Sequence, residues 1–546
     1  MTTMRWRRLR TWLWRLRARF SRGRLIARLL GARPPETRHE APGLVLVQAD
    51  GLSRTQFERA RAEGRLPFLR HLGAERGYRT LSHYAGLPST TPAVQAELFY
   101  GVRCAVPAFD YIARREGETR TMYEYHAAAA VQRQLERRGH GLLAGGSAHA
   151  DIYDGGAEEA HVCAARLSVG GMFQGQTVWT WARLLALHSP SLVRVVVLCL
   201  VEFALALYDF AAGLRQGRKL WPELKFVPVR TLVSAGLREW TTASAEAGIA
   251  QGLPVVHVNY MGYDEQAHRR GPSSAFAHWT LKGIDHSVRR LDHAARHAQA
   301  RDYQVWVYSD HGQAECKPYL SPDGKPLRAA VEELAARFGF EPEAPQAPPR
   351  TEELQRARWL RVSAAPLHAL LEAHAAAQQV RVRALGPVAH IYLPRALEDE
   401  EAKVFCAALA NEYRVPLVLP HPGPHAPVRA WAPDRALTLR QDGEQVLGAA
   451  HPFFEPALED LMRLVRHPDA GHVIALGWCA GSETLAFVDQ AGCHGGAHPK
   501  EVQGFALLPA GAANGRGWLR PMDLRAAALA RLRRNAAGAA APEGAA

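Results

Sequence analysis

Short apolar runs that end in aspartate or histidine recur four times along this 546-residue chain, and this pattern constrains its fold most strongly. They are "GLVLVQADG" with Asp50, "LPVVHVNYMGYDEQAH" with Asp264 and His268, "YQVWVYSDHGQ" with Asp310 and His311, and "TLAFVDQAGCHGGAH" with His494 and His498. Turn formers commonly end a buried strand, so one such segment alone indicates only a turn. In open α/β sheets, however, ligands bind beyond the carboxyl ends of the strands. The four segments together predict one assembled site on an α/β sheet.

The bulk composition is that of a globular protein, with 47% hydrophobic and 22% charged residues. The length allows a large core with one or more insertions. The seven cysteines are odd in number and include no C-x-x-C pair. A disulfide framework is therefore not expected, and a reducing compartment is favoured.

The N-terminal arm, residues 1–33, holds eleven arginines and no acidic residue, within a chain of net charge +14. Trp6, Trp12 and Trp14 alternate with these arginines, which is typical of a helix lying in a membrane interface against anionic headgroups. A nucleic-acid-binding arm would also be basic but has less use for tryptophan, and a solvated basic tail is the other alternative. No uninterrupted apolar segment follows the charges, so a secretory signal is not expected. We expect a cytoplasmic protein that is peripheral on the inner face of the membrane, with an anionic membrane surface rather than nucleic acid as partner.

A hydrophobic segment interrupts the alternation of strands and helices between about residues 165 and 245. Its central sequence, "SLVRVVVLCLVEFALALYDFAAGLRQGRKLW", is broken by Arg194, Glu202 and Asp209. Each charge would cost about 2.5 to 3.5 kcal/mol at the centre of a bilayer, so a simple transmembrane span is disfavoured. The segment is predicted to be a helical insertion that either packs against the core or rests on the membrane.

The chain divides into seven predicted parts. These are the arm (1–41), a first part of the core (42–164), the insertion (165–245), a second part of the core (246–340), a Pro-rich linker with a smaller α+β segment (341–465), a third part of the core (466–534) and a low-complexity tail (535–546) that we expect to be disordered.

A candidate nucleophile lies in "LPSTTPAVQAELFYG", before a predicted helix. Pro92 suits the first turn of a helix, where its missing N–H is not needed, and this predicts Thr91 as the N-cap. A hydroxyl at the positive end of a helix is well placed both to lose its proton and to meet a phosphate. An ordinary capping role for Thr91 is one alternative, and Thr90 as the reactive residue is another.

The order of these residues resembles the nucleotide pyrophosphatase/phosphodiesterase branch of the alkaline phosphatase superfamily. The matching features are Asp50, Thr91 before a helix, D-x-x-x-H at Asp264 and His268, "SDHG" at Ser309–Gly312, and "GCHGG" at Gly492–Gly496. The resemblance covers the core segments and leaves the arm, the insertion and residues 351–460 unexplained. It implies an α/β, alkaline-phosphatase-like sandwich in which helices flank a mostly parallel central sheet, to which the helical insertion is added.

The resemblance also implies two zinc ions per chain and divides the ligands between them. Asp50, Asp310 and His311 would hold one ion together with the Thr91 hydroxyl, and Asp264, His268 and His494 would hold the second. Carboxylate and imidazole ligands suit Zn²⁺, and paired metals can clamp the attacking and leaving oxygens of a displacement. His498 competes with His494, but the "GCHGG" turn favours His494 and leaves His498 to contact substrate. No residue after the threonine helix matches the family's oxyanion-stabilising asparagine.

The sequence therefore predicts a two-metal phosphodiesterase or phosphohydrolase that cleaves phosphoric ester or pyrophosphate bonds at a membrane surface. Thr91 would attack the phosphorus of a phosphorylated small-molecule or lipid substrate. Sulfatase chemistry is not predicted, because no formylglycine-type cysteine motif lies near Thr91. The alternatives are a phospho-headgroup transferase of the same superfamily and a non-catalytic membrane scaffold that contains zinc.

Overall fold

The computed structural model describes residues 39–166, 197, 199–208, 210–211, 231–342, 379–423, 426–513 and 517–533. Residues 1–38 of the predicted basic arm and the whole low-complexity tail lie outside these ranges, as do most of the hydrophobic insertion and most of the Pro-rich linker.

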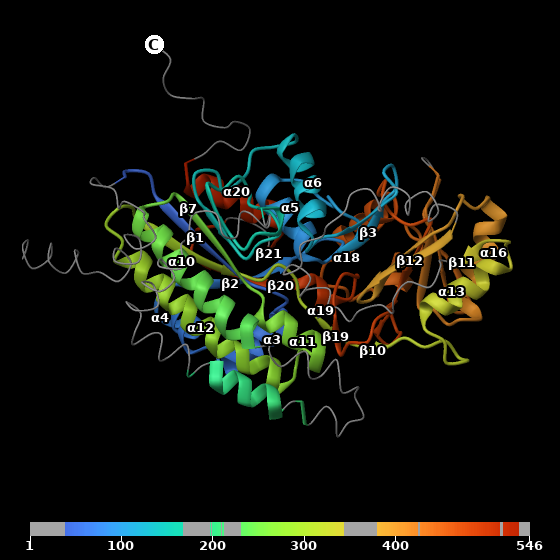
Figure 1. Ribbon diagram of the computed structural model, residues 1–546, viewed down its shortest axis with the longest axis horizontal. Helices are drawn as coiled ribbons and strands as arrows, with labels where there is room; N and C mark the ends of the chain where they lie inside the picture. The colour runs from blue at the N-terminus through green and yellow to red at the C-terminus, as the bar shows by residue number, and fades with distance from the viewer. Residues whose placement is uncertain are drawn as a thin grey trace, which may run out of the picture.

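An eight-stranded sheet forms the centre of the larger part of the molecule (Figure 1). Its order is β21 (Trp518–Leu519), β2 (Tyr78–Tyr84), β20 (Gln503–Pro509), β8 (Tyr303–Tyr308), β1 (Gly43–Ala49), β7 (Val255–Tyr260), β5 (Ser147–His149) and β6 (Glu159–His161). The neighbours from β8 to β6 are parallel, whereas β20 is antiparallel to both β2 and β8. The predicted α/β fold with a mostly parallel central sheet is confirmed.

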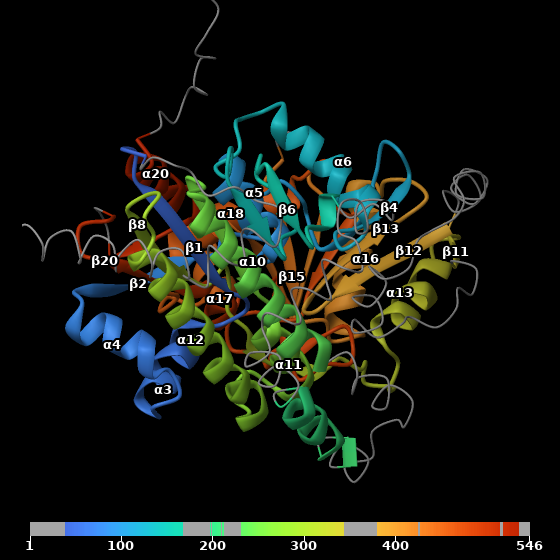
Figure 2. The same cartoon turned by 60° about the vertical axis from the view of Figure 1, so that its left-hand side comes forward.

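Helices cover both faces of this sheet, which explains why its central strands are apolar without alternation. Along β1, Leu44 and Leu46 enter one core, and Val45 and Val47 enter the other, because successive side chains point to opposite faces. One core includes residues of α5 (Thr91–Tyr100), α6 (Tyr125–Glu136) and α20 (Pro521–Arg531). The other includes residues of α3 (Arg54–Ala62), α4 (Pro67–Glu75), α10 (Arg238–Gln251), α11 (Gly262–Arg270) and α12 (Ala275–Arg296) (Figure 2).

A second, mostly antiparallel sheet lies to one side of the first, on the right in Figure 1. Its order is β11 (Glu341–Pro342), β12 (Gln379–Leu385), β13 (Val388–Tyr392), β17 (Val473–Leu476), β14 (Leu417–Pro420), β15 (Arg429–Ala432) and β16 (Arg435–Thr438). Helices α13 (Leu327–Ala336) and α16 (Asp399–Asn411) share a core on one face, and α17 (Gly443–Leu447) and α18 (Phe454–Val465) share a core on the other.

Two expectations about the last quarter of the chain differ from the structure. The sequence-based division placed residue 466 onward in the core, but β17 pairs with β13 and β14 in the second sheet, where it fills a central position. The apolar run before His494 is also no strand of the central sheet, because only β18 (Leu485–Ala486) forms and pairs with β10 (Lys317–Pro318). His494 instead follows β19 (Gly492–Cys493), which pairs with β9 (Ala314–Glu315). The other boundaries of the division remain predictions.

One described part of the insertion is a helix over residues 199–208, in which large apolar side chains are exposed and an acidic side chain is buried. Leu200, Phe203 and Tyr208 are exposed, whereas Glu202 is buried and its Oε1 accepts a 3.2 Å hydrogen bond from Trp279 Nε1 on α12. Among the described residues, none of the helices combines the length and the apolar character that crossing a membrane requires.

Candidate active site

The predicted metal ligands meet at the carboxyl ends of three adjacent parallel strands. Asp50 directly follows β1, and Asp310 comes two residues after β8. Helix α11 begins two residues after β7 and presents Asp264 and His268 one turn apart, as their spacing predicts. Gly51, at φ 69°, has no room for a side chain, because a Cβ there would lie 2.4 Å from Asp264 Oδ1. The β1 turn and α11 therefore come close enough to assemble one site.

The first group of donor atoms consists of Asp50, Asp310 and His311. His311 Nε2 lies 3.6 Å from Asp50 Oδ1 and 3.4 Å from Asp310 Oδ2. The Thr91 hydroxyl lies between them, 3.4 Å from Asp50 Oδ1 and 3.4 Å from His311 Nε2. These are the four residues that the resemblance assigns to the first metal ion.

The second group consists of Asp264, His268 and His494. His268 Nε2 lies 3.4 Å from Asp264 Oδ2 and 3.1 Å from His494 Nε2, and His494 Nε2 lies 3.8 Å from Asp264 Oδ1. His311 stacks on His494 with ring centroids 3.8 Å apart, and Asp264, His311 and His494 also form a compact donor group. His311 thus adjoins both groups, which the sequence-based division did not predict.

The donor set suits divalent cations. Asp310 is fully buried, its Oδ2 accepts no hydrogen bond from the described residues, and burial raises the pKa of its carboxyl group while His311 counteracts the rise. Burial and the neighbouring His311 hold the pKa of His494 well below its usual range, so its imidazole is neutral and able to bind a metal. Three carboxylates and three imidazoles in a buried cluster match the ligand preference of Zn²⁺, and cations would offset the clustered negative charge.

Backbone carbonyls orient the two histidines of the second group. His268 Nδ1 lies 2.8 Å from the Gly492 carbonyl oxygen, and His494 Nδ1 lies 2.9 Å from that of Ser89. A hydrogen bond from Nδ1–H leaves Nε2 of each ring with the lone pair that can bind a metal ion, and the two Nε2 atoms face each other. The two imidazole rings are therefore held in the orientation that binding one metal ion together requires.

The threonine helix begins one residue earlier than predicted. Helix α5 starts at Thr91, so Thr90 is the N-cap and Pro92 occupies the second helical position. The Thr90 side chain makes no capping hydrogen bond, and its buried hydroxyl has no partner among the described residues. Thr91 rather than Thr90 therefore presents its hydroxyl to the donor groups, from the positive end of α5.

His498, the alternative to His494, lies apart from both donor groups. It caps the short helix α19 (Pro499–Val502), where its Nδ1 accepts a hydrogen bond from the Lys500 backbone N–H at 3.1 Å. Its ring packs edge-on against Trp478, with centroids 5.0 Å apart. These contacts give His498 a structural role.

Asn259 was missed by sequence reasoning, although it lies five residues before Asp264 at the end of β7. Its Nδ2 donates a 2.9 Å hydrogen bond to Asp50 Oδ2, which orients that carboxylate. A small pocket beside Thr91 is lined by Asn259 and by the aromatic rings of Phe109 and Tyr123. The sequence signal that could have revealed Asn259 was an amide side chain within the apolar run that precedes Asp264.

Asn259→Ala is expected to lower both metal affinity and activity about 10- to 100-fold, the usual effect of removing a group that orients a metal ligand. Metal titration and steady-state kinetics on the purified variant measure the two losses. Asn259→Asp is expected to be worse, because it places a second carboxylate against Asp50. Unchanged metal affinity and activity in Asn259→Ala would show that Asp50 needs no support.

A known protein family matches part of this chain. Residues 155–414 match the family model described as type I phosphodiesterase / nucleotide pyrophosphatase. The chain therefore resembles this family over 260 of its 546 residues, a little under half of its length. Its members hydrolyse phosphoester or pyrophosphate bonds and depend on metal ions, so the predicted enzyme class is confirmed.

Several solved structures are also similar to this chain, at low sequence identity. Phosphonoacetate hydrolase from Sinorhizobium meliloti 1021, in complex with phosphonoformate, is 15% identical with a TM-score of 0.41, covering 92% of this chain and 98% of that one. Murine and human ectonucleotide pyrophosphatase / phosphodiesterase 5 are 13% and 12% identical with TM-scores of 0.45 and 0.46, each covering 91% of this chain and 96% of theirs. A search of curated proteins found no match.

Proposed function

We propose that this protein is a two-zinc phosphodiesterase or phosphohydrolase with Thr91 as its nucleophile, working at a membrane surface. The first zinc would be held by Asp50, Asp310, His311 and the Thr91 hydroxyl. The second would be held by Asp264, His268 and His494. The substrate would be a phosphorylated small molecule or lipid.

The position of the Thr91 hydroxyl is the observation that carries this proposal. It lies 3.4 Å from donor atoms of both Asp50 and His311, inside the buried ligand cluster. A purely structural zinc site is closed by its protein ligands and needs no hydroxyl beside them, so the arrangement favours catalysis over a zinc-containing scaffold. The helix N-terminus adds a partial positive charge where a phosphate would approach.

Each group at the site has its own role in the reaction. Bound metal would lower the pKa of the Thr91 hydroxyl and neutralise charge on the substrate phosphate. Thr91 would attack phosphorus while the P–O bond to the leaving group opposite it breaks, and would carry the remaining phosphoryl group, with its second ester substituent in the case of a diester, until water releases it as the phosphate product. Phe109 and Tyr123, which line the adjacent pocket, offer an apolar wall for the part of the substrate next to the phosphate.

Metal analysis and a substrate screen test the proposal together. Purified protein is expected to contain close to two zinc ions per chain and to hydrolyse bis-p-nitrophenyl phosphate, p-nitrophenyl phosphate, a dinucleotide or a phospholipid. Trapping the protein with substrate, followed by mass spectrometry, should place a phosphoryl group on Thr91. Metal-loaded protein that turns over none of these substrates would contradict a general phosphodiesterase.

Two features support the membrane part of the proposal. Residues 1–33 combine eleven arginines with tryptophans, and each arginine near an anionic surface contributes about 1 kcal/mol of attraction. The helix of residues 199–208 exposes Leu200, Phe203 and Tyr208 while burying Glu202. Exposed apolar patches of this kind mark interaction surfaces, and the adjacent Trp279, partly exposed beneath Lys282, suits an interface with headgroups.

Deletion of residues 1–33 is expected to release much of the protein from anionic vesicles and to leave hydrolysis of a small soluble diester nearly unchanged. Vesicle sedimentation measures the bound fraction, which should also fall as salt rises, because charge is screened over about 8 Å at physiological ionic strength. If the truncated protein stays bound, Leu200→Glu/Phe203→Glu should release it. Val404→Glu, at an exposed position on α16, is the matched control. Failure of the intact protein to bind vesicles would show that the membrane part is wrong.

A further inference from the structure

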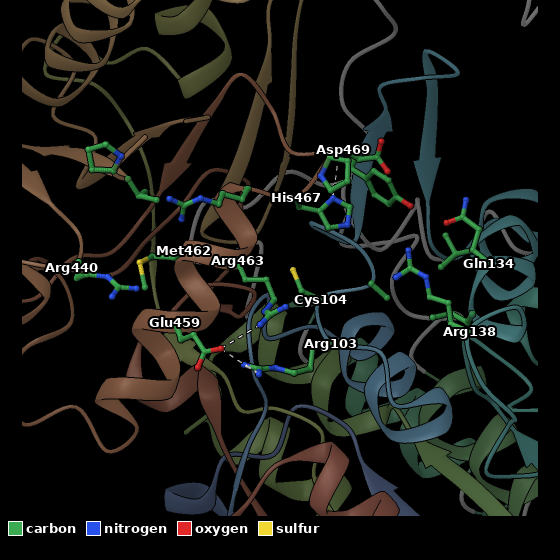
Figure 3. A pocket seen from close by; sticks show the side chains of 18 of the residues that line it. Arg103, Cys104, Gln134, Arg138, Arg440, Glu459, Met462, Arg463, His467 and Asp469 are labelled. Carbon is green, nitrogen blue, oxygen red and sulfur yellow. Dashed lines mark hydrogen bonds and ion pairs between the residues drawn. The ribbon is translucent and has the colours of Figure 1, made fainter. Parts of the chain in front are cut away.

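A cavity of about 710 Å³ lies at the end of α5 opposite Thr91. Arg103 and Cys104, which follow α5, line it together with residues of α6 and α18 (Figure 3). Helix α5 has ten residues and is therefore roughly 15 Å long, which separates the cavity from the Thr91 hydroxyl. The cavity is thus distinct from the candidate active site.

The lining of this cavity is strongly basic. Five arginines from four regions of the chain line it: Arg103 after α5, Arg138 after α6, Arg440 after β16, Arg463 on α18 and Arg466 just beyond α18. The lining includes only two acidic residues, Glu459 and Asp469, so five positive and two negative side chains leave an excess of three positive charges.

The two acidic residues already have partners. Glu459 Oε1 lies 3.5 Å from Arg103 Nη1 and 3.3 Å from Arg463 Nη2, and Asp469 Oδ1 accepts a 3.0 Å hydrogen bond from the Arg114 backbone N–H. The guanidinium groups of Arg138 and Arg440 make no hydrogen bond or ion pair with any residue that the structure describes. Figure 3 shows these two side chains on opposite sides of the cavity.

Apolar side chains complete the lining. Val131 and Leu135 of α6, Val428 before β15 and Met462 of α18 all contribute to it. Val131, Leu135 and Val428 are buried in the hydrophobic cores, so the cavity has fixed apolar walls beneath an exposed rim of arginines. Val131, Leu135 and Val428 are only 2 to 3% exposed, so the apolar surface left open comes from Met462 and the aliphatic stems of the arginines, which a ligand with an apolar body would cover and a free inorganic ion would not.

We infer that this cavity is a second, non-catalytic binding site for an amphipathic organic phosphate. The phosphate group would pair with a guanidinium group on the cavity rim, with Arg138 available on one side and Arg440 on the other, because guanidinium groups match the geometry of phosphate oxygens. The apolar body would rest on the walls formed by α6 and α18. A lipid phosphate and a nucleoside phosphate share this chemistry. The site uses no residue of the proposed metal centre, so its existence does not depend on the function of Thr91.

Binding of octylphosphonate tests the inference, because a phosphonate cannot be hydrolysed as a phosphate ester. Isothermal titration calorimetry on the metal-loaded full-length protein should show that Arg138→Ala/Arg440→Ala weakens one class of octylphosphonate sites at least about tenfold, and that one of the two single substitutions accounts for most of this loss. Hydrolysis of bis-p-nitrophenyl phosphate should stay within about twofold of the wild type. Arg133→Ala/Arg289→Ala removes the same charge from exposed positions outside the cavity and is the matched control.

Two further probes identify the source of the ligand. Methylphosphonate should bind this site at least about tenfold more weakly than octylphosphonate, because it covers none of the apolar walls. Loss of octylphosphonate binding alone in the double variant supports a lipid phosphate, and loss of AMP binding alone supports a nucleoside phosphate. The inference would be overturned if the double variant bound octylphosphonate and AMP as tightly as the wild type does and also kept the wild-type melting temperature.

Discussion

Thr91→Ala is expected to lower phosphodiester cleavage by about three to six orders of magnitude, the scale seen when the nucleophile of a hydrolase is removed. The variant loses the only hydroxyl that lies 3.4 Å from both Asp50 Oδ1 and His311 Nε2 among the described residues. Its metal content and melting temperature should stay close to those of the wild type, because both donor groups keep all their carboxylates and imidazoles. Initial rates with bis-p-nitrophenyl phosphate, together with metal analysis, check these expectations.

Thr90→Ala is the matched control, because it removes the neighbouring hydroxyl and leaves the helix start intact. The Thr90 hydroxyl is buried and has no hydrogen-bond partner among the described residues, so its loss is expected to change the rate by less than about tenfold. Thr91→Ser should retain part of the activity by keeping a hydroxyl. If Thr90→Ala abolishes activity and Thr91→Ala does not, Thr90 is the nucleophile.

Asp310→Ala and His268→Ala are each expected to remove about one zinc ion per chain and to reduce activity to near background. Asp310 belongs to the first donor group and His268 to the second, so each substitution should weaken a different ion. Because the proposed reaction uses both ions on one phosphate, losing either one stops it. Inductively coupled plasma mass spectrometry of the dialysed variants measures the loss.

His498→Ala is the control for this pair of variants, since His498 caps α19 apart from the donor groups. It should retain two ions per chain. His311→Ala is expected to lose more metal than either variant, because its imidazole adjoins both groups. Full metal content in both Asp310→Ala and His268→Ala would rule out the proposed division of ligands.

The central sheet and the convergence of the metal ligands could be predicted. The apolar runs in the sequence agreed with the rule that ligands bind beyond the carboxyl ends of the strands in an α/β sheet. The apolar runs before Asp50, Asp264 and Asp310 became the adjacent parallel strands β1, β7 and β8, which carry these residues to one edge. The run before His494 was equally apolar, yet it formed no strand of that sheet. His494 reaches the site through the β9 and β19 pair instead, which depends on long-range pairing rather than on local pattern.

Other features could not be predicted from local sequence patterns. The start of α5 at Thr91 rather than Pro92 is a one-residue shift, within the usual uncertainty of a helix boundary. The support that Asn259 gives to Asp50 joins residues 209 positions apart. The cavity between α6 and α18 collects arginines from four separate regions of the chain, each of which alone reads as ordinary surface charge.

The placement of β20 determines when during synthesis this protein can become active. β20 comes from the last tenth of the chain, yet it lies between β2 and β8 and pairs with both. A nascent chain that ends before it has two open sheet edges, which are sites of aggregation, and it also lacks His494 if it ends before residue 494. The sheet and the ligand set can be completed only after the ribosome has synthesised the chain as far as residue 509. Late truncations should therefore yield insoluble protein rather than a partly active enzyme.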